Sequence, residues 1–309
     1  MAAIVVDALS KSYSQGGGTQ ALTTISLKVQ PGELFGVIGP DGAGKTTLIR
    51  ILTTLLLADS GNATVLGHDV RRDFQEIRKI VGYMPGRFSL YHDLTVAENL
   101  EFFATVFGTT VTANYHLIAD IYEQLEPFKD RLAGKLSGGM KQKLALCCAL
   151  IHAPSALFLD EPTTGVDPVS RKDFWAMLAR LRANGITILV STPYMDEASR
   201  CDRIALIQQG KIIAMDSLSA ILANHATETY SVRGEKLFQI LKDLRIYPGT
   251  RYCYAFGQEH HLVLKPGTNG TAAASAYLRS LGHRQVVFSQ IEPNIEDVFI
   301  GLMQERGVA

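Results

Sequence analysis

A nine-residue glycine-rich segment, residues 39–47, limits the folds open to this 309-residue chain more than any other feature. Its letters, GPDGAGKTT, fit G-x-x-x-x-G-K-[ST], the pattern of a phosphate-binding P-loop. Residues 34–38 before it are apolar like a buried strand, and residues 46–52 after it resemble a helix start. Because a helix N-terminus directs N–H groups at an anion and its dipole favours negative charge, this context predicts a nucleotide-binding fold rather than a chance turn.

The residue types within this loop predict individual roles. Lys45 is expected to reach the β- and γ-phosphates of a nucleotide, and Thr46 to place its hydroxyl on Mg²⁺. The residues expected to surround the phosphates are Gly39, Pro40, Asp41, Gly42, Ala43, Gly44, Lys45, Thr46 and Thr47.

Two acids follow a second apolar run, at residues 157–161 (LFLDE). Acids at the carboxyl end of a parallel strand lie beside the crevice where such sheets bind ligands. We therefore expect Asp160 to hold Mg²⁺, directly or through water, and Glu161 to orient or deprotonate the attacking water. Alone, the pair would be read as a solvated turn; with a P-loop upstream, the functional interpretation is favoured.

Composition excludes several function classes. Thirty Lys and Arg residues balance thirty Asp and Glu residues, so whole-chain charge gives no case for nucleic acid or anionic lipid. The N-terminus lacks a basic region followed by a long apolar core, so no signal peptide is expected. The longest apolar stretches are too short to span a bilayer. The four cysteines form no C-x-x-C pair and are expected to be reduced thiols.

The order of predicted elements indicates an α/β fold with a mainly parallel sheet. Strands are expected at 4–9 and 25–29, on either side of a polar turn at 14–18, and at 62–66, 156–159 and 186–190. A mostly helical stretch covers about 96–151. Its first helix, 96–107, is preceded by a capping box with Thr95 as N-cap and Glu98 at N3.

After about residue 220 the pattern changes. We expect strand 228–233, helix 235–244, strands 251–256 and 260–265, helix 271–281, strand 285–289 and helix 294–303. This βαββαβ order plus one helix is the ferredoxin-like arrangement, an α+β fold. His260 and His261 are adjacent on a strand and should face opposite sides of the sheet, which argues against a metal site.

A second anion-binding helix start lies between the P-loop and the acids. Ser137, Gly138 and Gly139 precede an apolar helical run at 144–151. One nucleotide has little use for two such N-termini from one subunit. A second copy of the chain could supply the other side of the phosphates, which implies two nucleotides sandwiched in a symmetric dimer.

These motifs, in this order, resemble the ATP-binding-cassette (ABC) ATPases. Residues 136–140 match the family signature L-S-G-G-x. Residues 164–167 look like the D-loop, with Asp167 at its end, and Tyr13 matches the aromatic residue that stacks on adenine. The resemblance covers about residues 3–220. It implies an ABC ATPase domain at 1–220, with a mixed sheet and a helical subdomain at about 86–152, which binds ATP and Mg²⁺; residues 221–309 would be an accessory domain.

Three further segments look like bacterial multidrug-export ATPases, including the daunorubicin-resistance group: residues 83–85, 131–135 and 291–299. In that group the membrane permease is usually a separate chain. The resemblance therefore implies a peripheral subunit on the cytoplasmic face of a bacterial membrane, contacting its permease through residues 82–100.

Two family positions depart from the pattern. Where the Q-loop normally carries glutamine, this chain has Gly86, and where the switch histidine normally stands it has Pro193. Glycine offers no side chain to Mg²⁺ or water, and proline offers neither a ring nitrogen nor an N–H to the γ-phosphate. Loss of one preorganised donor costs on the order of 10²–10³ in rate, so hydrolysis is expected to be slow.

Three functions remain open from the sequence. The favoured one is the ATP-hydrolysing subunit of an export pump, as a homodimer or paired with a second ABC ATPase chain. The second is a binding-only regulatory subunit, suggested by Gly86 and Pro193. The third, a soluble cassette ATPase of translation or repair, is disfavoured because the chain has one cassette, neutral charge and no heptads. The C-terminal part could regulate, dimerise or bind a ligand, and dimer stabilisation is favoured.

Overall fold

The computed structural model describes residues 1–13, 18–225, 227–268 and 270–305. Its backbone contacts divide the chain into two compact units, Met1–Ser217 and Leu218–Ala309. The turn expected at residues 14–18 lies, apart from Gly18, outside the described residues.

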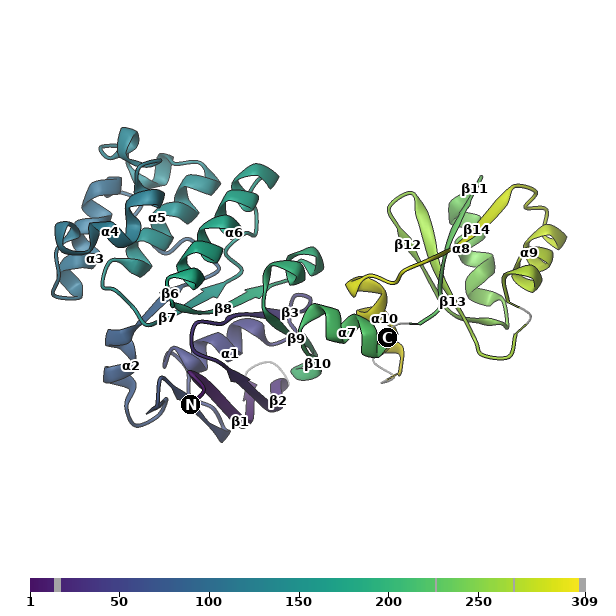
Figure 1. Cartoon of the computed structure of the whole chain (residues 1–309), viewed down its shortest axis with the longest axis horizontal. Helices are drawn as coiled ribbons and strands as arrows, with labels where there is room; N and C mark the ends of the chain where they lie inside the picture. The colour runs from purple at the N-terminus through teal and green to yellow at the C-terminus, as the bar shows by residue number, and fades with distance from the viewer. Residues whose placement is uncertain (14–17, 226, 269, 306–309) are drawn as a thin grey trace. The chain divides into compact units, whose positions relative to one another are not determined.

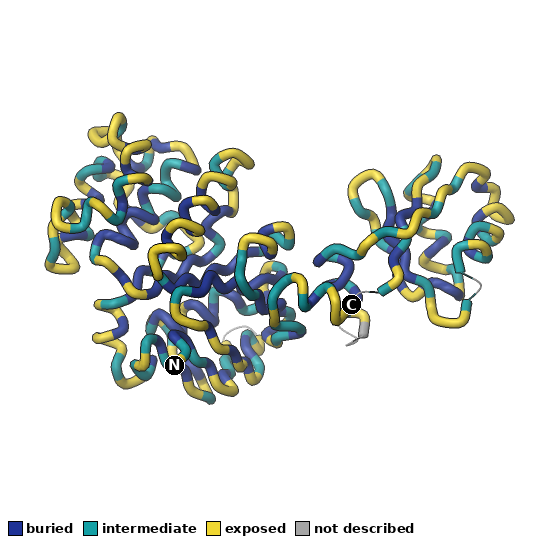
Figure 2. The backbone as a smooth tube through the Cα atoms, viewed as in Figure 1, coloured by how far each residue is buried: buried dark blue, intermediate teal, exposed yellow. Residues whose placement is uncertain are grey.

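The centre of the first unit is a mixed sheet whose strands are largely buried (Figure 2). Neighbouring strands are parallel except for the β9–β10 pair at one edge. Across the sheet the described order is β10 (Lys211–Asp216), β9 (Arg203–Gln208), β3 (Leu34–Ile38), β8 (Thr187–Thr192), β7 (Ala156–Asp160) and β6 (Val81–Met84). This confirms the predicted α/β class, in which carboxyl ends of parallel strands share one edge.

One face of this sheet packs on helix α1 (Lys45–Leu52), which lies between it and a second, antiparallel sheet (Figure 1). The second sheet has the order β2 (Thr19–Val29), β1 (Ile4–Tyr13), β4 (Ser60–Val65) and β5 (His68–Asp69). Helix α2 (Phe74–Ile80) follows it in the chain. The apolar positions of β1, β2, β4 and α1 share one core.

Helices α5 (Gly138–Leu150) and α6 (Pro168–Ala183) pack on the other face of the central sheet, and α3 (Val96–Val106) and α4 (Val111–Tyr122) pack on α5 (Figure 1). The short 3-10 turns of this unit are η1 (Glu126–Phe128), η2 (Ala133–Lys135) and η3 (Met195–Arg200). The predicted capping box is confirmed: Glu98 N donates to Thr95 Oγ1 at 3.2 Å, and Thr95 N donates to the Glu98 carboxylate at 2.7 Å. In the described residues no helix is both long enough and apolar enough to cross a bilayer.

The second unit contains a four-stranded antiparallel sheet among its described residues, in the order β12-β13-β11-β14. Its elements are α7 (Leu218–His225), β11 (Thr229–Gly234), α8 (Leu237–Ile246), β12 (Thr250–Phe256), β13 (Glu259–Leu264), α9 (Gly270–Ser280), β14 (Val286–Ile291) and α10 (Ile295–Glu305). The predicted ferredoxin-like order is confirmed. His260 contacts Leu237 O at the start of α8 at 2.7 Å, whereas His261 contacts Asp297 of α10 at 2.7 Å, as opposite faces require.

The sequence reading missed the β9–β10 hairpin. Its turn, Gln209-Gly210, has φ values of 46° and 72°, the left-handed conformation of a tight hairpin turn. Glycine adopts this conformation freely but glutamine does not, so the usual Asn-Gly or Asp-Gly signal was missing.

Candidate nucleotide site

The P-loop is confirmed as a connection from β3 to the N-terminus of α1. The Lys45 side chain crosses the loop, and its Nζ donates to Gly39 O at 2.7 Å and to Pro40 O at 2.9 Å. Lys45 is only 3% exposed, so its charge lies inside the curve of the loop rather than in solvent. The ammonium and the first N–H groups of α1 together make a positive lining for an anion.

Two glycines of the loop allow close approach of distant backbone. A Cβ at Gly39 would lie 2.1 Å from Ile207 O, and one at Gly44, whose φ is 106°, would lie 2.4 Å from Ala21 O. The β9–β10 turn supports the loop from outside, because Gly210 N donates to Ala43 O at 3.0 Å. Any side chain at Gly39 or Gly44 would displace this backbone.

The two acids lie beside the P-loop, at the end of β7 as predicted. Asp160 Oδ1 accepts from Thr46 Oγ1 at 3.0 Å, and Glu161 Oε1 lies 3.1 Å from Lys45 Nζ. Glu161 has φ of 50°, a left-handed conformation that costs a non-glycine residue roughly 1–2 kcal/mol. Such strain persists where surrounding structure imposes it, and it is common at functional sites.

Ser191, near the end of β8, is a site residue that sequence reasoning missed. Its Oγ donates to Asp160 Oδ1 at 2.7 Å and accepts from Glu161 N at 3.0 Å. Ser191 is fully buried, and its two hydrogen bonds hold the Asp160 carboxylate and the Glu161 backbone in place. The available signal was its place in an apolar strand next to the expected switch position.

This donor set fits a magnesium nucleotide. Thr46 and Asp160 bring a hydroxyl and a carboxylate oxygen together at the phosphate end of the loop, and hard oxygen donors are the ligands that Mg²⁺ prefers. In the described residues no group of three or more His, Cys, Asp or Glu side chains could bind a metal by protein ligands alone. A site with few protein ligands suits Mg²⁺, which takes its other ligands from water and phosphate.

Tyr13, the predicted adenine-stacking residue, lies at the end of β1. Its hydroxyl is 3.3 Å from Thr47 Oγ1 in the first turn of α1, and the residue is 38% exposed. The ring is therefore next to the P-loop and open to solvent, as a stacking platform must be.

Both departures from the family pattern lie at the site. A Cβ at Gly86 would be 3.0 Å from Asp160 O, so the Q-loop backbone packs directly on Asp160. Pro193 follows Thr192, whose carbonyl accepts from Gly39 N at 3.3 Å. Gly86 therefore lies against Asp160, Pro193 follows a residue bonded to the P-loop, and neither presents a polar side chain.

The signature and D-loop segments lie against each other. Ser137 caps α5, with Oγ accepting from Met140 N at 3.3 Å, and a Cβ at Gly139 would be 2.6 Å from Ser170 Oγ. Asp167 caps α6 and accepts from Val169 N and Ser170 N at 3.1 and 3.0 Å. The Ser170 N–H, first of several donors, holds the pKa of the Asp167 carboxyl below its usual range.

Comparison with known proteins agrees with this geometry. Residues 22–164 match the ABC transporter family. The chain is 36% identical over its whole length to the probable multidrug ABC transporter ATP-binding protein YbhF of Escherichia coli, but spans only 53% of that protein. It is 36% identical to the Nod factor export ATP-binding protein I of Paraburkholderia xenovorans, covering 97% of each chain. The daunorubicin resistance ATP-binding protein DrrA2 of Streptomyces coeruleorubidus is 35% identical, with coverage of 98% and 96%.

Solved structures share the fold over more than two thirds of this chain. An ATP-binding subunit of an ABC transporter superposes with a TM-score of 0.64 at 27% identity, over 72% of this chain and 92% of that one. A dimeric ATP-binding cassette bound to ADP and Pi gives a TM-score of 0.64 at 23% identity, over 70% and 98% of the two chains. With the P-loop, the acids and the signature in one unit, the chain belongs to the ABC transporter ATPase family.

Proposed function

We propose that this chain hydrolyses ATP to drive a separate membrane permease of an export pump. The observation that carries the proposal is the contact set of the P-loop and the acids: Lys45 with Glu161, and Thr46 with Asp160. Export is supported by relatives named for multidrug transport, Nod factor export and daunorubicin resistance. A peripheral place on the cytoplasmic face of a bacterial membrane belongs to the same proposal.

In this mechanism the α1 N-terminus and Lys45 bind the β- and γ-phosphates. Glu161, held next to Lys45, orients the attacking water and accepts its proton. Thr46 and Asp160 would hold Mg²⁺, which neutralises charge on the phosphates. Tyr13 stacks on the adenine ring.

The second half of each site would come from another subunit. Ser137, Gly138 and Gly139 begin α5 and present N–H groups that their own P-loop does not use. In the proposed dimer these groups contact the nucleotide bound to the partner, with Asp167 at the junction, and closure on ATP moves the permease. The nucleotide-binding domain predicted at 1–220 corresponds to the unit Met1–Ser217, because a boundary at 220 would divide α7. The accessory domain predicted at 221–309, which would stabilise the dimer, corresponds to Leu218–Ala309.

We infer that the permease would dock in a pocket of about 390 Å³. It lies where the predicted contact region, 82–100, meets α3 and α5, and its lining is mainly apolar. Lining residues include Tyr83, Met84, Leu90, Phe103, Phe107 and Ala149. A short permease helix with apolar side chains would fit this pocket.

The alternative is a binding-only subunit, which Gly86 and Pro193 specifically favour. Such a chain would bind ATP and dimerise without turnover, and it would need a catalytic partner cassette.

Steady-state ATPase activity of the full chain with Mg²⁺, compared with Glu161→Gln and Pro193→His, separates the two. We expect slow wild-type turnover that Glu161→Gln reduces by roughly 10²–10³-fold while ATP binding remains. ATP binding without turnover, with activity gained by Pro193→His, would support the binding-only subunit. The assay is repeated with the permease in lipid, because some cassettes are active only there.

A further inference from the structure

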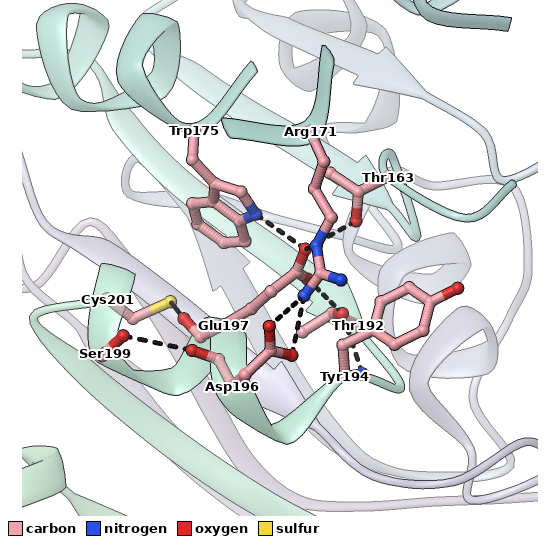
Figure 3. A network of polar contacts seen from close by, with 9 residues as sticks. All are labelled: Thr163, Arg171, Trp175, Thr192, Tyr194, Asp196, Glu197, Ser199 and Cys201. Atoms are coloured by element: carbon pink, nitrogen blue, oxygen red, sulfur yellow. Dashed lines mark hydrogen bonds and ion pairs between the residues drawn. The ribbon is translucent and has the colours of Figure 1, made fainter. Parts of the chain in front are cut away.

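Glu197, four residues after Pro193, has a buried carboxylate at the centre of a network of polar contacts (Figure 3). It is 2% exposed. Its Oε1 accepts from Thr163 Oγ1 at 2.8 Å, Arg171 Nε at 2.6 Å and Trp175 Nε1 at 2.8 Å. Its Oε2 accepts from Thr192 Oγ1. We call these five residues the Glu197 network.

The four donors come from three segments around the site. Thr163 is two residues after Glu161, and Thr192 immediately precedes Pro193. Arg171 and Trp175 lie on α6, the helix that Asp167 caps. Because Thr192 O also accepts from Gly39 N at 3.3 Å, one carboxylate connects the P-loop, the acids, the switch position and the D-loop helix.

The segment after Pro193 is held from the same side. Tyr194 N donates to Thr192 Oγ1 at 3.1 Å, and the Arg171 guanidinium carbon lies 4.5 Å from the centre of the Tyr194 ring. Arg171 also donates to the exposed Asp196 carboxylate at 2.6 Å. The backbone of residues 192–197 is therefore fixed by side chains at both ends.

A buried ion pair of this kind is weak evidence for stability, because desolvation offsets much of the attraction between the charges. A satisfied polar network does restrict geometry, since each donor fits one position of the carboxylate. Pro193 has no side-chain group that could bond to the γ-phosphate. The position of residues 192–197 is therefore set by their contacts with the Glu197 network.

We propose that Glu197 is a positioning residue for ATP hydrolysis, which fixes the Pro193 segment against the P-loop and the D-loop helix. The inference rests on the proposed function, because it concerns the same reaction. Glu197 acts through Thr192 and Arg171 and does not itself contact ATP.

The test measures kcat and the KM for ATP of the full chain with Glu197→Gln and Arg171→Met. We expect kcat to fall by about 10-fold or more, with KM within about threefold of wild type, because transition-state geometry is lost while phosphate binding remains. The matched control is Arg182→Met, which removes an exposed ion pair with Asp202 from the same helix and should leave kcat unchanged. Equal effects of Arg171→Met and Arg182→Met would overturn the proposal.

A double-mutant cycle separates the effect of the network on the switch segment from a general loss of activity or stability. If the network positions the switch segment, Pro193→His raises kcat in the wild-type background and has no effect with Glu197→Gln. The same gain in both backgrounds would contradict the proposal. If Glu197→Gln fails to fold, Trp175→Phe replaces it, because this variant removes one of the four donors and keeps an aromatic ring. With Trp175→Phe, Pro193→His should raise kcat by less than it does in the wild-type background.

A spectroscopic readout separates failure of this inference from failure of the proposed function. Trp175 is the one tryptophan of the sequence and donates directly to Glu197, so its emission reports on the network. In Glu161→Gln protein, ATP should change that emission, and Arg171→Met should remove the change. An emission response without wild-type turnover would show that ATP reaches the Glu197 network while refuting the proposed hydrolysis, and the inference would fall with it. Turnover without an emission response would leave hydrolysis standing and overturn the inference alone.

Discussion

The phosphate side of the site and its switch side are built differently. On the phosphate side Lys45, Thr46, Asp160 and Glu161 contact one another through charged or polar side chains. On the switch side, Gly86 packs on Asp160, Pro193 follows Thr192, and neither residue has a polar side chain. The contrast teaches that the phosphate side carries both the proposed phosphate-binding groups and the proposed general base, whereas the switch side adds no polar side chain. Substitutions on the phosphate side should therefore have larger effects on ATP affinity or kcat than those at Gly86.

On ATP affinity, the largest effect is expected from Lys45→Met. Loss of the ammonium removes charge-assisted bonds worth about 1.5–3 kcal/mol, so ATP affinity should fall by about 10–100-fold. Titration calorimetry with ATP measures this. Lys79→Met, which removes an exposed i,i+3 pair with Glu76, is the control. Unchanged affinity in Lys45→Met would show that the phosphates do not bind on this side.

Ser191→Ala should have the next largest effect. Asp160 loses one of its two side-chain donors and keeps Thr46, while the N–H of Glu161 still donates to Ser191 O at 3.1 Å. A hydrogen bond to a charged group contributes about 1.5–3 kcal/mol, so kcat should fall about tenfold. The Mg²⁺ concentration for half-maximal ATPase activity should rise, since Asp160 is no longer oriented. Exposed Ser280→Ala is the control, and a normal Mg²⁺ dependence in Ser191→Ala would assign Ser191 to packing alone.

Tyr13→Ala should weaken ATP binding by about fivefold, the ~1 kcal/mol expected at the low end for stacking on a base. Tyr13→Phe keeps the ring and loses only the hydroxyl near Thr47, so its affinity should stay near wild type. Fluorescent-nucleotide titration compares the two. If Tyr13→Phe lowers ATP affinity as much as Tyr13→Ala does, the hydroxyl contact rather than ring stacking contributes the affinity.

The smallest effect is expected from Gly86→Gln, which restores the family residue. Its Cβ would start 3.0 Å from Asp160 O, so the loop must shift before the amide can act. We expect kcat within about threefold of wild type, since the gained donor and the displaced contact oppose each other. Gly86→Ala carries the same Cβ without the amide. A large rise in kcat with Gly86→Gln but not with Gly86→Ala would show that the switch side lacks only this side chain.

The sequence predicted elements whose signals are local. The strand before the P-loop, the Thr95–Glu98 capping box and the order of elements after residue 220 each follow from neighbouring residues. Ser191 and Glu197 were missed because their roles depend on segments that meet only after folding. A buried serine in an apolar strand has no pattern of its own, and Glu197 sits among polar neighbours that look exposed.

The backbone contact between Gly210 and Ala43 has a consequence for biosynthesis. The residues of the P-loop leave the ribosome early, but the β9–β10 turn, which contacts the P-loop backbone, is synthesised much later. A nascent chain ending before residue 210 therefore carries the motif without this support. Because domains assemble as units during synthesis, the ability to bind ATP should arise late and abruptly, once this hairpin has closed over the loop.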